Sequence, residues 1–358
     1  ERMHLYLEDI QDKSVGLVVN QTSIIQNVHL VDSLISIGVN VKKIYSPEHG
    51  FRGTADAGEK VEDNIDPVSG VPIVSLYGNN KKPHAEQLKD IDILVFDIQD
   101  VGVRFYTYIS TLHYVMEAAA ENEIPVIVLD RPNPNAHYVD GPVLKEAFKS
   151  FIGMHPVPVV YGMTIGEYAF MINGEGWLNG GIQCQLKVVP CLNYNHDIRY
   201  ILPLKPSPNL PNGLSVALYP SLCFFEGTTV SVGRGTEMPF QIYGHPKATK
   251  TDFTFMPVSG PGSKYPKHEN TLCHGTDLRR KTPVRDRLDL SYLLAMHKDA
   301  QERNYQFFID NNFFDKLAGS SALKKMIKLG YTEDEIRLTW QDELLAFKLI
   351  RDKYLIYD

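Results

Sequence analysis

Residues 46–53, Ser-Pro-Glu-His-Gly-Phe-Arg-Gly, combine a carboxylate, an imidazole and a guanidinium with two glycines. They follow residues 41–45, whose apolar character predicts a buried strand. A glutamate between proline and His-Gly lies in a rigid, non-helical loop, where partial burial can bring its pKa near the working pH for general acid/base chemistry. We therefore expect Glu48 to be catalytic and His49 and Arg52 to bind a ligand. The competing interpretation is a surface glutamate in a turn.

Polar side chains also follow the other strands predicted in the first half of the chain. Apolar runs predict strands at residues 15–19, 41–45, 71–77, 91–96 and 126–129. Helices are expected over 24–35 (capped by residues 20–23 and ended by Gly38), near 83–89 and over 108–121. This alternation indicates an α/β fold with a doubly wound parallel sheet, whose ligands bind outside the carboxyl ends of the strands.

The segment after the strand at 91–96 holds the largest group of candidates. Asp97 and Asp100 are candidate catalytic carboxylates because both directly follow a strand end. The candidate substrate-binding side chains of this segment are Gln99, Arg104, Tyr106 and Tyr108. The alternative is that Asp100 or Thr107 caps the next helix and that the tyrosines pack in the core.

Two further segments of the chain contribute candidate contacts. Prolines fix the backbone of residues 130–135, so Arg131 and Asn133 point in set directions, although a structural turn is the alternative. Tyr161 is a candidate contact further along. Thr164 and Glu167 have the spacing of a capping box, which predicts a structural role for Glu167.

In the second half of the chain the regular alternation of predicted strands and helices ends, because prolines divide residues 156–220 into short, irregular segments. We predict a domain over 1–145 that carries most site loops and a smaller, mixed α+β domain over 146–358 that closes the cleft. Its C-terminal end is predicted to be helical over 288–300, 313–317, 321–329 and 334–354. Its densest polar run, 225–236, supplies Glu226 as a candidate carboxylate and Arg234 as a candidate ligand contact.

Composition narrows the class of protein. With 358 residues, 43% hydrophobic and 22% charged, the chain suits a globular protein of two domains. Its 36 basic and 43 acidic residues give a net charge of −7, which disfavours nucleic acid as a partner. No apolar run reaches the ~20 residues of a transmembrane helix, and the chain opens with polar residues rather than a signal peptide. The four cysteines are expected to be buried thiols, with a Cys184–Cys191 disulfide as a minor alternative.

The sequence lacks the common motifs for nucleotide cofactors, for a serine nucleophile and for a metal site. The sequence has no Gly-x-Gly-x-x-Gly after its first strand, no phosphate-binding Gly-Lys-Ser/Thr loop and no Gly-x-Ser-x-Gly elbow. The 12 histidines include no His-x-x-x-His pair, so a scattered set of Glu48, His49, Asp97 and Asp100 is the weak metal hypothesis. We expect no cofactor and no metal.

Several of these motifs together resemble one family. The shared segments are 20–22 (Asn-Gln-Thr), 46–53, 96–108, 130–134 and 161–164, and the likeness continues to residues 340–357. In this combination the chain resembles the exo-acting β-N-acetylmuramidases of the NamZ type, formerly a bacterial domain of unknown function. The resemblance makes Asn20 a further candidate substrate contact.

The resemblance implies a Rossmann-like first domain, a cleft, and release of N-acetylmuramic acid from the non-reducing end of peptidoglycan fragments. It makes Glu48 catalytic. Glycoside hydrolases commonly pair two carboxyls, although a 2-acetamido group of the substrate can act as the nucleophile instead. We therefore expect Asp97, Asp100 or Glu226 either to be the second carboxylate or to orient the acetamido group. A guanidinium suits the lactyl carboxylate of the substrate; the candidates are Arg52, Arg104, Arg131 and Arg234. For each arginine the alternative is an ion pair between the domains.

Two other functions stay open: a non-catalytic module that binds wall sugars, and a metal-dependent hydrolase that uses Glu48, His49 and the aspartates. The substrate implies export to the periplasm or cell exterior. The sequence leaves oligomeric state and stereochemistry undecided.

Overall fold

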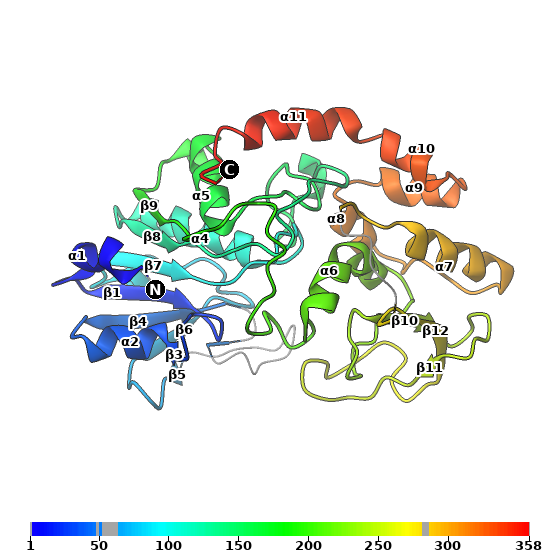
Figure 1. Cartoon of the computed structure of the whole chain (residues 1–358), viewed down its shortest axis with the longest axis horizontal. Helices are drawn as coiled ribbons and strands as arrows, with labels where there is room; N and C mark the ends of the chain where they lie inside the picture. Colours follow the sequence, from blue (N-terminus) through cyan, green and yellow to red (C-terminus); the bar gives the residue numbers. More distant parts are fainter. Residues whose placement is uncertain (1, 48–49, 52–63, 281–285, 358) are drawn as a thin grey trace.

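The computed structural model describes residues 2–47, 50–51, 64–280 and 286–357. A large sheet with its helices forms one part of the molecule, and a small sheet with further helices forms the other (Figure 1). Among the described residues, no helix has both the length and the apolar character needed to cross a membrane. Glu48, His49 and Arg52 lie outside the described residues.

The large sheet has seven strands in the order β5-β6-β4-β1-β7-β8-β9. All neighbours pair in parallel except β5 and β6, which are antiparallel. The strands are β1 (Val15–Val19), β4 (Val41–Ser46), β5 (Asn64–Ile65), β6 (Pro72–Ser75), β7 (Ile93–Asp97), β8 (Val126–Leu129) and β9 (Leu186–Val189). The predicted Rossmann-like, doubly wound α/β fold is therefore confirmed.

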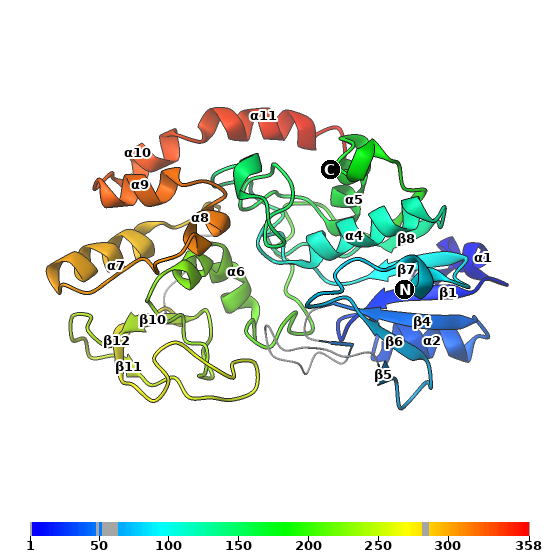
Figure 2. The same cartoon turned by 180° about the vertical axis from the view of Figure 1, so that it is seen from behind.

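Helices cover both faces of this sheet, which explains why its central strands are continuous apolar runs. Every residue of β1 and β7 is buried. On one face, α1 (Leu7–Ile10) and α2 (Leu30–Ser36) pack against side chains such as Leu17 and Val95. On the other, α4 (Tyr108–Glu121) and α5 (Ile165–Gly174) pack against side chains such as Val18 and Phe96, as Figure 2 shows from behind. The short α3 (Ala85–Leu88) lies within the region predicted.

The helix predicted over 24–35 is wrong in its first half. A two-stranded hairpin, β2 (Ile24–Ile25) and β3 (Val28–His29), precedes α2. Gln26 turns the hairpin with a φ of +55°, which a helix does not allow. The imidazole of His29 then accepts a hydrogen bond from the backbone N–H of Val31, so His29 is the residue that caps α2.

The second part contains α6 (Gly213–Leu222), the 3₁₀ turn η4 (Cys223–Gly227) and a sheet of order β10-β12-β11. The strands of this sheet are antiparallel: β10 (Ile242–His245), β11 (Thr254–Phe255) and β12 (Cys273–Asp277). The C-terminal helices are α7 (Ser291–Glu302), α8 (Phe313–Ala318), α9 (Ala322–Lys328), α10 (Glu333–Leu338) and α11 (Gln341–Arg351). Short 3₁₀ turns are η1 (Met3–Leu5), η2 (Glu146–Phe148) and η3 (Asn179–Gly181).

The C-terminal helical region is confirmed, with one difference. The helix predicted over 334–354 is divided into α10 and α11 near Trp340. The indole N–H of Trp340 donates to the Asp140 carboxylate (3.2 Å), and burial of the indole fixes the break. In α11, Leu344 and Phe347 are buried in the core, whereas Leu345 and Leu349 are exposed.

The chain crosses repeatedly between the two parts. β9 and α5, which complete the large sheet and its cover, come from beyond residue 145, where the sequence predicts the first domain to end. α11 runs back over the molecule, so that the C-terminus lies beside α5 (Figure 1). The division at residue 145 stays a prediction.

Arg104 holds the two parts together from a fully buried position. Its guanidinium donates to the carbonyl oxygens of Pro142 (2.7 Å), Val157 (2.7 Å) and Leu317 (2.8 Å), the last at the end of α8. Burial lowers the pKa of Arg104 to about 9. The arginine therefore supplies a donor to the carbonyls of Pro142 and Leu317 and a second donor to that of Val157, which also accepts from the Leu144 N–H (3.1 Å).

We predict that Arg104→Met destabilises the protein by about 3 kcal/mol or more, because methionine fills the space but removes the donor that Arg104 gives to the Pro142 and Leu317 carbonyls. Urea unfolding followed by circular dichroism measures the change. The exposed Arg303→Met is the control. Equal stability of the Arg104 variant and the wild type would contradict the role assigned to this side chain.

Candidate functional site

The carboxyl edge of the large sheet brings together the predicted loops. β1 lies between β4 and β7 in the sheet. The connections that leave the strands on the two sides of β1 therefore run in opposite directions, and ligands of doubly wound sheets bind at such a point. Asn20 follows β1, Asp97 ends β7, and Asp130 and Arg131 follow β8. Glu48 comes two residues after the end of β4 in the sequence.

Asp97 and Arg131 form a bidentate ion pair at this edge. The guanidinium donates from Nε to Oδ1 (2.6 Å) and from Nη2 to Oδ2 (2.9 Å) of Asp97. Both residues line a cavity of about 790 Å³. Because each charge neutralises the other, Asp97 is a poor second catalytic carboxylate and Arg131 a poor receptor for a substrate carboxylate.

Asp100 lies in a different environment, although only three residues separate it from Asp97. Its Oδ2 accepts hydrogen bonds from the Tyr161 hydroxyl and the Gly102 N–H (2.7 Å). Its Oδ1 is buried and has no hydrogen-bond partner among the described residues. Burial raises the pKa of Asp100 to about 6, against the lowering effect of Tyr161. Asp100 is thus a carboxyl that can hold a proton near neutral pH.

Three predicted amide contacts position loops instead of facing a cavity. Asn20 donates to the Tyr108 hydroxyl (3.0 Å), and Gln99 donates to the Pro132 carbonyl (2.7 Å). Asn133 donates to the carbonyl of Met163 (2.7 Å). These bonds connect the loops after β1, β7 and β8, so they fix the shape of the sheet edge.

A second cavity, of about 190 Å³, lies where the two parts of the molecule meet. It brings together four predicted site residues: Tyr106 and Tyr108 from the first part, and Glu226 and Arg234 from the second. The Tyr106 and Tyr108 rings pack edge to face, with centroids 4.9 Å apart. Aromatic walls with a few polar groups are typical of small-ligand sites. Arg104, by contrast, is used by the three carbonyls described above.

Glu226 is an ionised carboxylate in this cavity. Arg234 donates to it from Nε (3.1 Å), and Lys267 lies nearby, bonded to carbonyl oxygens of the same loop, including that of Thr228 (2.7 Å). Burial raises the pKa of Glu226, but the charges of Arg234 and Lys267 lower it by more than burial raises it. The pKa of Glu226 therefore lies below its ordinary value. Glu226 can therefore stabilise or orient a positively polarised group.

Some cavity residues have no signal in the sequence. Ser207, Asn209, Tyr219 and Phe240 also line it. Ser207 and Asn209 lie in the proline-rich stretch. The one sequence pattern that could indicate them as site residues is a pair of polar residues that alternates with prolines. Tyr219 and Phe240 are isolated aromatic residues, which sequence does not distinguish from core.

Asp130 is a partly buried carboxyl to which the sequence motifs give no role. It accepts from the Thr164 hydroxyl (2.7 Å), the Gly166 N–H (2.8 Å) and the Tyr357 hydroxyl (2.5 Å). Burial raises its pKa to about 6. The predicted capping box of Thr164 and Glu167 is confirmed at the start of α5.

The cysteines and the metal hypothesis add no chemistry to the described site. The four cysteines are free, so the Cys184–Cys191 disulfide is not formed. Burial raises the pKa of the Cys184 and Cys191 thiols to about 12, which disfavours nucleophilic thiolates. Within the described part of the chain, no three His, Cys, Asp or Glu side chains gather to hold a metal ion. The metal hypothesis also used Glu48 and His49, which lie outside that part.

These features define an α/β protein with a polar and aromatic cavity between its two parts. The family model for the N-terminal domain of the exo-β-N-acetylmuramidase NamZ matches residues 15–213, and that for its C-terminal domain matches residues 217–357. The peptidoglycan β-N-acetylmuramidase NamZ of Bacillus subtilis (strain 168) is 39% identical over 377 aligned positions, which cover 98% of this chain and 89% of that protein.

Solved structures agree with this match. A DUF1343 family protein from Bacteroides fragilis is 44% identical, with a TM-score of 0.91 over 100% of this chain and 98% of that one. A second DUF1343 family protein from the same organism is 28% identical, with a TM-score of 0.84 over 99% of this chain and 97% of that one. The chain belongs to the NamZ family of exo-β-N-acetylmuramidases.

We predict that Asp100→Asn changes the pH dependence of stability. Because the pKa of Asp100 is about 6 in the folded protein, against 3.8 ordinarily, the folded state binds more protons and loses stability as pH rises through 6. Asparagine stays neutral. Relative to the wild type, the variant should gain about 3 kcal/mol between pH 4 and pH 7, at 1.36 kcal/mol per pH unit.

Urea unfolding at pH 4, 5, 6 and 7 measures this difference. Asp197→Asn, at an exposed position, controls for the general effect of the exchange. A stability difference for Asp100→Asn that stays constant over this range would contradict the raised pKa.

Proposed function

We propose that this enzyme is a glycosidase that releases N-acetylmuramic acid from the non-reducing end of peptidoglycan fragments. The observation that carries the proposal is the cavity shared by both parts, in which an ionised carboxylate, a guanidinium and two tyrosines converge. Membership of the NamZ family over nearly the full chain supports the reaction class.

Glu48 is the proposed general acid/base. It comes two residues after the end of β4 in the sequence, and β4 is the neighbour of β1 in the sheet. In the proposed reaction its carboxyl protonates the oxygen of the leaving sugar, and its carboxylate then removes a proton from the water that adds to the anomeric carbon.

Glu226 is the proposed second carboxylate. Arg131 bonds both carboxylate oxygens of Asp97, and Asp100 is buried with a raised pKa, whereas Glu226 lines the cavity and accepts from Arg234 at Oε1 alone. An ionised carboxylate can stabilise the positive charge that develops at the anomeric carbon, or orient a substrate acetamido group.

Arg234 is the proposed receptor for the lactyl carboxylate. It lines the cavity and bonds Glu226 through Nε, while no described residue accepts from its Nη1 or Nη2. These two nitrogens can make the parallel hydrogen bonds that a carboxylate accepts. Arg104 instead donates from Nη1 and Nη2 to carbonyls, and Arg131 donates from Nε and Nη2 to Asp97.

We predict that Glu48→Gln abolishes turnover of a chromogenic N-acetylmuramic acid β-glycoside and that Glu226→Gln lowers kcat by about 100-fold or more, as loss of an electrostatic stabiliser does. Release of the chromophore is measured with and without chelator, and circular dichroism checks folding. Near-normal turnover by Glu48→Gln would reject its role. Binding without turnover by the wild type would favour a sugar-binding module. Loss of activity with chelator and its recovery with a divalent ion would favour a metal enzyme.

We predict that Arg234→Lys raises KM for the N-acetylmuramic acid glycoside about tenfold more than for the N-acetylglucosamine glycoside, since lysine cannot make the bidentate contact. Steady-state kinetics on both substrates measures this. Arg279→Lys, whose guanidinium pairs with Asp277 at the surface, is the matched control. Equal losses on both substrates would count against a carboxylate receptor.

We also propose that the enzyme is exported and acts in cell-wall turnover, because its proposed substrate lies outside the cytoplasm. Fractionation of the cells that make it, followed by immunodetection, tests this. Recovery in the cytoplasmic fraction alone would reject the proposal.

A further inference from the structure

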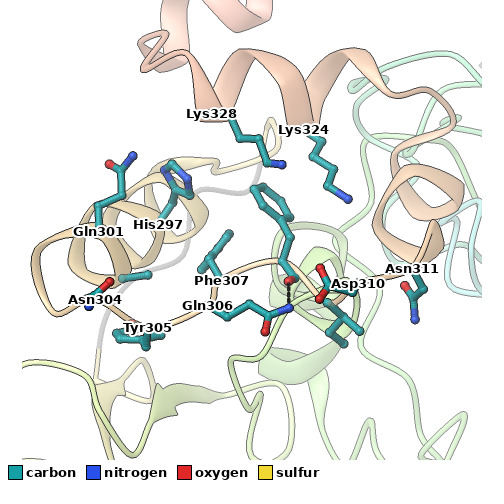
Figure 3. A pocket seen from close by; sticks show the side chains of 13 residues that line it. His297, Gln301, Asn304, Tyr305, Gln306, Phe307, Asp310, Asn311, Lys324 and Lys328 are labelled. Carbon is teal, nitrogen blue, oxygen red and sulfur yellow. Dashed lines mark hydrogen bonds between the residues drawn. The ribbon is translucent and has the colours of Figure 1, made fainter.

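A third cavity, of about 580 Å³, lies in the second part of the molecule and has no role in the proposed reaction. α7, α9 and the segment 304–311 surround it (Figure 3). α8 separates it from the cavity of Glu226: Phe313 lines that cavity, while the next residue, Phe314, packs on Phe308 with ring centroids 4.8 Å apart. The two cavities are therefore distinct sites.

Two lysines from one face of α9 give this cavity a positive side. The ammonium groups of Lys324 and Lys328 lie 5.2 and 5.6 Å from the centre of the Phe308 ring. Figure 3 shows both side chains descending from α9 into the cavity. Neither forms an ion pair with a carboxylate among the described residues. The lining includes a single acidic side chain, Asp310, so the lysines outnumber it. An anion entering here would meet two cations that make cation–π contacts with Phe308 and form no ion pair within the described part of the chain.

The rest of the lining suits a sugar. Amide groups that both donate and accept come from Gln301, Asn304 and Gln306, and aromatic surface comes from Tyr305 and Phe307. Gln306 is fixed by its bond to the Phe308 carbonyl (2.8 Å). Side-chain amides match hydroxyl and acetamido groups, and aromatic surface matches the apolar face of a sugar ring.

His297 adds a neutral polar group to this wall. Its ring contacts Phe307 and Phe308, with centroids 5.2 and 5.8 Å away. Burial lowers its pKa, and Lys328 lowers it further, so the imidazole is uncharged at neutral pH and hydrogen-bonds without adding charge. Asp315 on α8 also lies near both lysines, but it is not part of the lining.

The backbone of this cavity is joined to the loop that carries Glu226. The Thr229 N–H donates to the Phe307 carbonyl (2.8 Å), and the Ile309 N–H donates to the Gly227 carbonyl (3.3 Å). A ligand held here would thus be bound to a segment in direct contact with the proposed active site.

We propose that this cavity is an accessory binding site for a saccharide that carries a carboxylate. The lysines bind the carboxylate, and the amides and aromatic side chains bind the sugar. That the ligand belongs to the same wall polymer as the substrate rests on the proposed function; the anionic saccharide site itself does not.

The test compares variants of the full chain in sedimentation with insoluble peptidoglycan and in calorimetric titration with N-acetylmuramic acid, N-acetylglucosamine and inorganic phosphate. The double variant Lys324→Gln/Lys328→Gln should bind peptidoglycan about fivefold more weakly, the effect of two exposed ion pairs together. It should hydrolyse the small chromogenic glycoside at the wild-type rate. Asp310→Asn should strengthen binding. Lys325→Gln, on the exposed side of α9, is the matched control and should change nothing.

Unchanged peptidoglycan binding by the double variant, or an equal loss in the Lys325 variant, would overturn the proposal. Phosphate that competes as well as N-acetylmuramic acid would also overturn it, by showing a simple anion site. If the wild type releases no N-acetylmuramic acid yet the lysine variant still loses binding, the proposed function fails and the accessory site stands.

Discussion

The buried guanidinium of Arg104 is the interaction on which the shape of the site depends. The loop between β7 and α4 carries Asp100 and Tyr106 and leads to Tyr108, the first residue of α4. Arg104 attaches this loop to the carbonyl of Leu317 in the second part. A buried charge is expensive to desolvate, and carbonyl dipoles that already point inward offset part of that cost. The cavity between the parts therefore has a fixed width before any ligand arrives, which reduces the cost of ordering it.

The acidic groups around this edge are placed in unlike surroundings. Asp97 faces a guanidinium, Asp100 faces a phenol and apolar side chains, and Glu226 lies between two cations. Burial raises the pKa of Asp100, whereas the burial of Glu226 is outweighed by the charges of Arg234 and Lys267, which hold its pKa below the ordinary value. Such a difference lets one protein hold both an acid and a base at the same pH. Amide side chains that bond to backbone, such as Gln99, keep these surroundings constant by fixing the loops.

Much of the fold is predictable because its signals are local. β1 and β7 are continuous apolar runs, and α4 has a clear helical period. The hairpin before α2 was missed because it depends on one left-handed residue, Gln26, and on the imidazole of His29. The sequence places Asp97 and Asp100 in one loop, but their partners lie 34 and 61 residues away. Spacing along a chain carries no information about such partners, so the role of each carboxyl could be assigned only in three dimensions.

The return of α11 to the first part has a consequence for how the protein is made. Tyr357 donates to Asp130 at the sheet edge, the Ile356 N–H donates to Glu167 of α5, and Arg351 donates to the Gly162 carbonyl. The sheet edge and α5 therefore acquire these contacts only after residues 351–357 have been synthesised. The N-terminal part, although it is synthesised first, depends on this later segment for part of its hydrogen bonding.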